Sequence, residues 1–236
     1  MTESPAIDWK LRGPPRPPGA PLARPRSAAT LIVLRDDAAK PRVLMGKRHA
    51  GHKFMPNLWV FPGGRVDRAD YHAPFATDLQ PAAASVFAAH IPPGRGRALA
   101  LAAVRETFEE AGLLLARPAE PRPLAGPWRD FAAQGAAADL AALEIVGRAI
   151  TPPFIARRFD TWFLMTSAER LVSLERQADC GELDEIAWVD LDEALALPLS
   201  GVTRKMLAEA VARLDDPERP RLFMRDLHGG PRPTVL

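Results

Sequence analysis

The segment Arg105–Leu113, which reads Arg-Glu-Thr-Phe-Glu-Glu-Ala-Gly-Leu, predicts a helix with one acidic and one apolar side. Successive helical residues turn by about 100°, so Glu106, Glu109 and Glu110 share a narrow arc. The apolar residues on the opposite side are Leu101, Val104, Phe108, Ala111 and Leu115. We therefore expect this helix to pack against a core and to hold three carboxylates together on its other face.

These carboxylates predict a bound cation. Like charges three or four positions apart on a helix repel by a few tenths of a kcal/mol per pair, so a cluster on a packed helix favours a counter-ion. An all-oxygen set without His or Cys suits Mg²⁺ or Mn²⁺ and does not suit zinc. Arg105 lies beside the cluster and can orient a carboxylate through charge-assisted hydrogen bonds. The alternative interpretation is a solvated acidic face.

A second motif precedes the helix. The strand-like run Leu58–Phe61 ends at Gly63-Gly64, where paired glycines permit a backbone turn. Gly64, Asp70 and the acidic segment together resemble the Nudix box, which runs Gly, five residues, Glu, seven residues, Arg-Glu-hydrophobic-x-Glu-Glu-x-Gly-hydrophobic. Thr107 stands where that box has an aliphatic residue, and Asp70 replaces its first Glu.

The spacing also differs from the Nudix box. Asp70 and Arg105 are separated by 34 residues instead of seven, so the chain carries 34 − 7 = 27 additional residues, at 71–97. An insertion that bulges outward from the loop would leave the loop and the helix intact. We expect residues 71–97 to form a lid over the site or a contact in a homodimer.

The resemblance implies a fold and a reaction. The fold would be a Nudix-type α/β/α sandwich with a central mixed β-sheet, spanning residues 28–215. The reaction would be hydrolysis of a diphosphate that links a nucleoside to a second moiety. The resemblance also implies that the metal ligands are Glu106, Glu109, Glu110 and the carbonyl oxygen of Gly64.

It assigns further roles as well. Arg105 would position the carboxylates, Asp70 would hold the Gly-Gly loop to the helix, and Glu106 would be a candidate general base. In this family a carboxylate on a distant loop often takes the base role, and here Glu182 is the first candidate and Glu185 the second. An exposed acidic loop is the alternative interpretation for both.

Two other segments indicate what the second moiety of the substrate is. An insertion within the box, together with Arg157–Thr161, resembles the coenzyme A diphosphatases that act in mammalian peroxisomes. The coenzyme A signature before Phe-Pro-Gly-Gly matches in spacing and has Arg at Arg48, but Lys53 replaces an Arg and Asn57 a Gly. Lysine meets a phosphate as a point charge and not as a two-pronged fork.

Three functions follow from these matches. The leading one is cleavage of coenzyme A or acyl-coenzyme A to 3′,5′-ADP and (acyl-)4′-phosphopantetheine, with Arg48, Lys53 and Arg158 binding substrate. The alternative is a pyrophosphohydrolase for ADP-ribose, a dinucleotide or another nucleoside-diphosphate-linked compound. The third is a Nudix-fold binding module without catalysis, although such modules commonly lose the box carboxylates that this chain retains.

The composition of the chain limits which partners and which cellular compartment we expect. A net charge of +2 is too small to indicate a nucleic-acid polymer as partner. No apolar run approaches 18 residues, so we expect neither membrane insertion nor export. The single cysteine, Cys180, suits a reducing compartment. The chain ends without a Ser-Lys-Leu peroxisomal address. We expect a cytoplasmic bacterial enzyme that acts on a small-molecule diphosphate.

The chain divides into three expected parts. Seven prolines among the first 26 residues predict an extended or disordered arm at 1–27. The Nudix domain follows at 28–215, and 216–236 is expected to be a tail. Strands are predicted at 28–34, 42–46, 58–61, 144–151, 158–165 and 185–190, and helices at 81–90, 97–115, 128–143, 191–197 and 200–214.

Overall fold

The computed structural model describes residues 14–37, 40–51, 55–176, 183–226 and 231–236. The strands are β1 (Arg26–Arg35), β2 (Arg42–Arg48), β3 (Trp59–Val60), β4 (Gly63–Arg65), β5 (Phe75–Thr77), β6 (Ala116–Pro118), β7 (Ala136–Asp139), β8 (Glu144–Ile150), β9 (Phe159–Ser167), β10 (Leu183–Asp190), β11 (Leu222–Asp226) and β12 (Pro231–Val235). The α-helices are α1 (Pro81–His90), α2 (Arg95–Ala111), α3 (Arg129–Ala132), α4 (Leu191–Ala196) and α5 (Gly201–Asp215).

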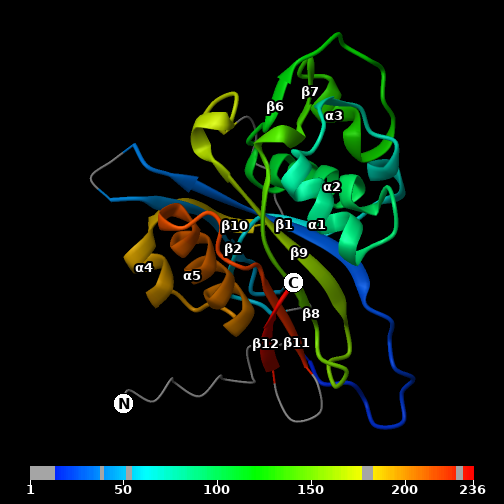
Figure 1. Ribbon diagram of the computed structural model, residues 1–236, viewed down its shortest axis with the longest axis vertical. Coiled ribbons are helices and arrows are strands. Elements are labelled where there is room, and N and C mark those ends of the chain that lie inside the picture. The colour runs from blue at the N-terminus through cyan, green and yellow to red at the C-terminus, as the bar shows by residue number, and fades with distance from the viewer. Residues whose placement is uncertain (1–13, 38–39, 52–54, 177–182, 227–230) are drawn as a thin grey trace.

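Strand β1 runs through the middle of the main sheet and is buried along most of its length. A strand that is apolar on both faces needs a covering layer on each side. Figure 1 shows these layers, with α1, α2 and α3 on one side of the sheet and α4 and α5 on the other. The sheet order is β10-β2-β1-β9-β8-β11-β12, with β3 added to β2 and β4 added to β1. The expected α/β/α sandwich is confirmed.

The sheet is mixed because two of its pairs are parallel, β1 with β9 and β8 with β11. Each face has its own core. The first lies under α2 and includes Leu31, Val104 and Leu164. The second lies under α5 and includes Ile32 and Met206. Neighbouring residues of β1 enter different cores because side chains alternate across a strand.

The insertion at 71–97 folds into β5 and α1. Strand β5 joins β6 and β7 in a small second sheet, and α1 packs against the start of α2. The two helices approach closely at Gly96, where a Cβ atom would lie 2.7 Å from Cβ and Cγ of Phe87. The Phe87 ring also lies 4.7 Å, centroid to centroid, from the ring of Trp162 on β9. The insertion therefore extends the core behind α2.

We expect Phe87→Ala to destabilise the protein by about 3–5 kcal/mol, because removing a buried phenylalanine leaves a cavity. The exposed fraction of Phe87 is 3%. The free energy of unfolding, measured by urea denaturation, checks this. Val172→Ala is the control, because Val172 is 56% exposed and its truncation should leave stability unchanged. Equal effects of the two changes would contradict a core role for the insertion.

Two helix predictions were wrong in extent. The helix expected at 97–115 begins at Arg95 and ends at Ala111, because Gly112 adopts a left-handed conformation with φ of 67°. Its N–H donates to the carbonyl oxygen of Phe108 at 2.8 Å, a common way for glycine to end a helix. The helix expected at 128–143 is wrong beyond its first turn. Gly135, with φ of 64°, interrupts it, and the alanines that follow form β7.

Segments at both ends of the expected domain pack against it. Residues 14–25 have a defined path against the loop before β9: the N–H of Arg16 donates to the Phe154 carbonyl at 2.7 Å, and that of Ala156 to the Pro14 carbonyl at 3.0 Å. The segment expected to be a tail contributes β11 and β12 to the main sheet. Among the described residues, no helix combines the length and apolar character that crossing a bilayer would require.

Candidate active site

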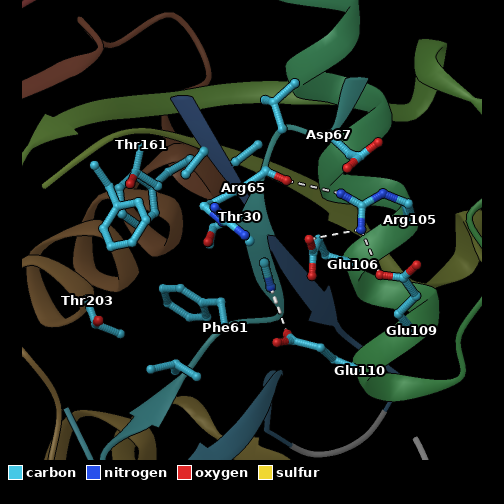
Figure 2. Close-up of a pocket in the computed structure, with 18 of the residues that line it drawn as sticks. Thr30, Phe61, Arg65, Asp67, Arg105, Glu106, Glu109, Glu110, Thr161 and Thr203 are labelled. Carbon is cyan, nitrogen blue, oxygen red and sulfur yellow. Dashed lines mark hydrogen bonds and ion pairs between the residues drawn. The ribbon is translucent and has the colours of Figure 1, made fainter. Parts of the chain in front are cut away.

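A cavity of about 670 Å³ lies between the acidic face of α2 and the start of α5, a size common for small-molecule sites. The sheet supplies much of its wall, because β4, β1 and β9 run side by side and Arg65, Ala28 and Thr161 pair across them. Figure 2 shows the glutamates of α2 on one side of this cavity and Thr161 and Thr203 on the other.

Arg105 organises the acidic face. Its Nη1 donates to Oε1 of Glu106 at 2.9 Å and to Oε2 of Glu109 at 2.6 Å. Its Nη2 donates to the carbonyl oxygen of Arg65 at 3.0 Å, so the guanidinium links α2 to β4, the strand that contains Gly63 and Gly64 (Figure 2). Burial alone would lower the pKa of Arg105, but hydrogen bonds to Asp70 and the surrounding carboxylate charges raise it above its ordinary value.

Asp70 anchors Arg105 from behind. The carboxylate is fully buried and accepts hydrogen bonds from Nε and Nη2 of Arg105 at 2.9 and 3.1 Å. It also accepts from the indole N–H of Trp128 at 2.8 Å and from the backbone N–H of Asp67 at 2.7 Å. The prediction that Asp70 holds the loop to the helix is confirmed.

The two glycines bring the loop backbone against the other carboxylates. The N–H of Gly63 donates to Oε2 of Glu110 at 2.9 Å. A Cβ atom at Gly64 would lie 2.4 Å from the carboxylate carbon of Glu106. A larger residue at position 64 would therefore displace the Glu106 carboxylate from the position in which Arg105 holds it.

The donor set suits a hard divalent ion, because carboxylate oxygens and the backbone of Gly64 adjoin each other on one side of the cavity. Across the part of the chain that the structure describes, no three acidic, His or Cys side chains are gathered closely enough to enclose a metal ion. Glu106 and Glu109 turn toward Arg105, and Glu110 turns toward Gly63. The ligand roles of Glu106, Glu109, Glu110 and Gly64 remain predictions.

The expected substrate residues are only partly brought together. Arg48 lines the cavity. Arg158 does not: its Nε and Nη1 donate to the carbonyls of Thr151 and Ala23, both at 3.0 Å. The expected role of Arg158 in substrate binding is therefore not supported by its position. Lys53 lies outside the described residues.

The two loop carboxylates that were candidate bases, Glu182 and Glu185, have different outcomes. Glu182 lies outside the described residues. Glu185 lies on β10 opposite Lys47 of β2 and is not among the residues that line the cavity. No residue of the insertion at 71–97 lines it either, so a lid role for the insertion has no support in the structure.

Three of the arginines that line the cavity were not predicted as site residues: Arg65, Arg68 and Arg157. Arg65 directly follows the Gly-Gly turn, and Figure 2 shows its side chain in the cavity between the sheet and α2. Arg157 stands next to Arg158 in the segment that had been singled out, but the motif alone does not tell which of two adjacent arginines faces the substrate.

Comparisons with known proteins agree with this geometry. The model of the NUDIX domain family matches residues 24–210. A solved NUDIX hydrolase from Alicyclobacillus acidocaldarius is 30% identical, with a TM-score of 0.60, over 80% of this chain and 92% of that one. Its fold is therefore similar over almost its whole length.

Two curated relatives match over shorter stretches. A Caenorhabditis elegans protein named as a nudix hydrolase is 41% identical over 38% of this chain. An acyl-coenzyme A diphosphatase from Gallus gallus is 36% identical over 36% of this chain. The matched regions span 22% and 28% of those two relatives. From the family match over most of its length, we conclude that this chain belongs to the Nudix family.

Proposed function

We propose that this Nudix hydrolase is a divalent-metal-dependent diphosphatase that cleaves coenzyme A or acyl-coenzyme A to 3′,5′-ADP and (acyl-)4′-phosphopantetheine. One observation carries the diphosphatase part of the proposal. The cavity combines the acidic face of α2 with the side chains of several arginines. A metal ion and a polyanionic substrate need these two kinds of surface side by side.

Coenzyme A as substrate rests on narrower support. Part of the chain is similar to an acyl-coenzyme A diphosphatase, and the Arg48 of the partial coenzyme A signature lines the cavity. The insertion at 71–97 is a further feature in which the sequence resembles this branch. Recognition of the second moiety would fall to the cavity wall away from α2, where β9 contributes Phe159 and Thr161.

The carboxylates of Glu106, Glu109 and Glu110 and the carbonyl of Gly64 would hold the ion. Bound Mg²⁺ or Mn²⁺ supplies neutralisation of the diphosphate oxygens and a lowered pKa of an attacking water. Arg105 keeps Glu106 and Glu109 at fixed positions through its two Nη1 contacts. We assign to Glu106 the acceptance of a proton from the attacking water, a contribution of roughly 10²–10⁴ in rate. Glu182 is the alternative base.

A substrate panel tests the proposal. The purified protein is incubated with Mg²⁺ or Mn²⁺ and with coenzyme A, acetyl-coenzyme A, ADP-ribose, NADH or a diadenosine polyphosphate, and the products are separated by chromatography. We expect the highest kcat/KM for the coenzyme A compounds, with 3′,5′-ADP as a product, and no turnover after EDTA. Cleavage of ADP-ribose or NADH without cleavage of coenzyme A would contradict the substrate, and turnover unaffected by EDTA would contradict the metal dependence.

A further inference from the structure

Arg157 lies in the loop before β9 and lines the same cavity as the glutamates of α2. Its side chain is exposed. Among the described residues no hydrogen bond or ion pair to its guanidinium is found, in contrast to Arg105, which is fully engaged by Asp70, Glu106 and Glu109. Arg157 thus presents a positive charge to the cavity that no acidic side chain in the described part of the chain neutralises.

The loop that carries Arg157 is held in place from outside the cavity. Residues 14–16 form a bridge with it, with Pro15 opposite Ile155. Arg158 donates to the carbonyls of Ala23 and Thr151, which joins the loop to the N-terminal segment and to the end of β8. Adjacent arginines therefore have different tasks. Arg158 fixes the backbone, and Arg157 is left facing the cavity.

The strand that follows Arg157 is offset from Gly64 along the sheet. In the sheet, Gly64 of β4 pairs with Ala29 of β1, whereas Phe159 of β9 pairs with Arg26 of β1. The two paired positions on β1 are 29 − 26 = 3 residues apart, which corresponds to roughly 10 Å along the strand. Arg157 precedes Phe159 and lies farther still along the chain. The backbone at the start of β9, next to Arg157, is therefore offset along the sheet from the loop that contacts the α2 carboxylates.

We propose that Arg157 determines substrate specificity by binding a phosphomonoester on the ribose of the substrate. The inference rests on the proposed function, because coenzyme A carries such a 3′-phosphate in addition to its diphosphate. A phosphomonoester bears nearly two negative charges at neutral pH, and the guanidinium fork can bind two of its oxygens at once. The third phosphate is therefore matched to an arginine that is not one of the expected metal ligands.

The test compares Arg157→Gln, Arg157→Lys and the native protein on two substrate pairs that differ by this phosphate: coenzyme A with dephospho-coenzyme A, and NADPH with NADH. Arg122→Gln is the charge-matched control, because Arg122 is exposed and does not line the cavity. Binding of 3′,5′-ADP and of AMP, measured by calorimetry, provides a readout that needs no turnover.

We expect Arg157→Gln to lower kcat/KM for the phosphorylated member of a cleaved pair by about 10- to 100-fold, mainly through KM, as expected for loss of a charged hydrogen bond. The unphosphorylated member should be nearly unaffected, Arg157→Lys should be intermediate, and 3′,5′-ADP should lose affinity while AMP does not. Equal losses for both members, or none for either, would overturn the inference. A third outcome is that the native protein prefers NADPH to NADH, does not cleave coenzyme A, and loses this preference in Arg157→Gln. That outcome would support the role of Arg157 and refute the substrate proposed above.

Discussion

Replacing Glu106 by Gln is expected to remove nearly all diphosphate hydrolysis, with kcat falling by at least about 10²–10⁴, the range for loss of a general base. Glu106 would serve as both metal ligand and base. The loss of kcat should therefore be larger than the loss expected from removing either role alone. Its carboxylate touches Nη1 of Arg105 at 2.9 Å and packs against Gly64. A neutral amide of the same shape fits this space but neither holds a cation strongly nor accepts a proton.

The measurement is kcat with coenzyme A and saturating Mg²⁺ or Mn²⁺, and circular dichroism checks that the variant is folded. Glu193→Gln is the control because Glu193 is exposed on α4 and does not line the cavity. It should retain native kcat. A folded Glu106→Gln protein with more than about a tenth of native kcat, a loss smaller than the range for general-base removal, would refute the role assigned to Glu106.

Asp70→Asn is expected to destabilise the protein by about 3–5 kcal/mol, because it breaks a buried ion pair and leaves the Arg105 charge uncompensated from behind. The Asp70 carboxylate is fully buried and accepts from Arg105, Trp128 and Asp67. An amide cannot accept all four of these hydrogen bonds with its two termini, since its NH₂ group is a donor.

Urea denaturation measures this effect, and the same change at Asp130 is the control. Asp130 also bonds an arginine, Arg129, but both side chains are about 70% exposed. Asp130→Asn should leave the free energy of unfolding essentially unchanged, since exposed ion pairs contribute little. Similar unfolding midpoints for the two variants would show that Asp70 does not anchor the active-site helix.

The sequence predicted the candidate site best where the spacing of a motif and the chemistry of its residues indicate the same contact. The acidic arc of α2 follows from helical periodicity, and the close approach of Gly64 to Glu106 follows from the motif order, because the box positions are defined relative to each other. The role of Asp70 could also be predicted, since a short carboxylate between the loop and Arg105 has few other partners. These relations survive an insertion of 27 residues because α1 packs behind α2, away from the cavity.

Other features depend on tertiary packing that no local pattern reports. The alanines at 136–138 favour helix by propensity, yet they form a strand between β5 and β6 after Gly135 ends the preceding turn. Burial overrides a propensity difference of a few tenths of a kcal/mol per residue. The choice between Arg157 and Arg158 likewise depends on residues 14–23, which lie far away in sequence and hold Arg158 through the Ala23 carbonyl.

The central claim is that the acidic face of α2 holds a divalent cation, and Mn²⁺ binding measured by calorimetry or electron paramagnetic resonance tests it most directly. The native protein is compared with the triple variant Glu106→Gln, Glu109→Gln, Glu110→Gln and with a charge-matched control, Glu169→Gln, Asp192→Asn, Glu193→Gln, whose positions are exposed and outside the cavity. We predict that Mn²⁺ binding is lost in the first variant and native in the second. Equal Mn²⁺ affinity in all three proteins would contradict the account.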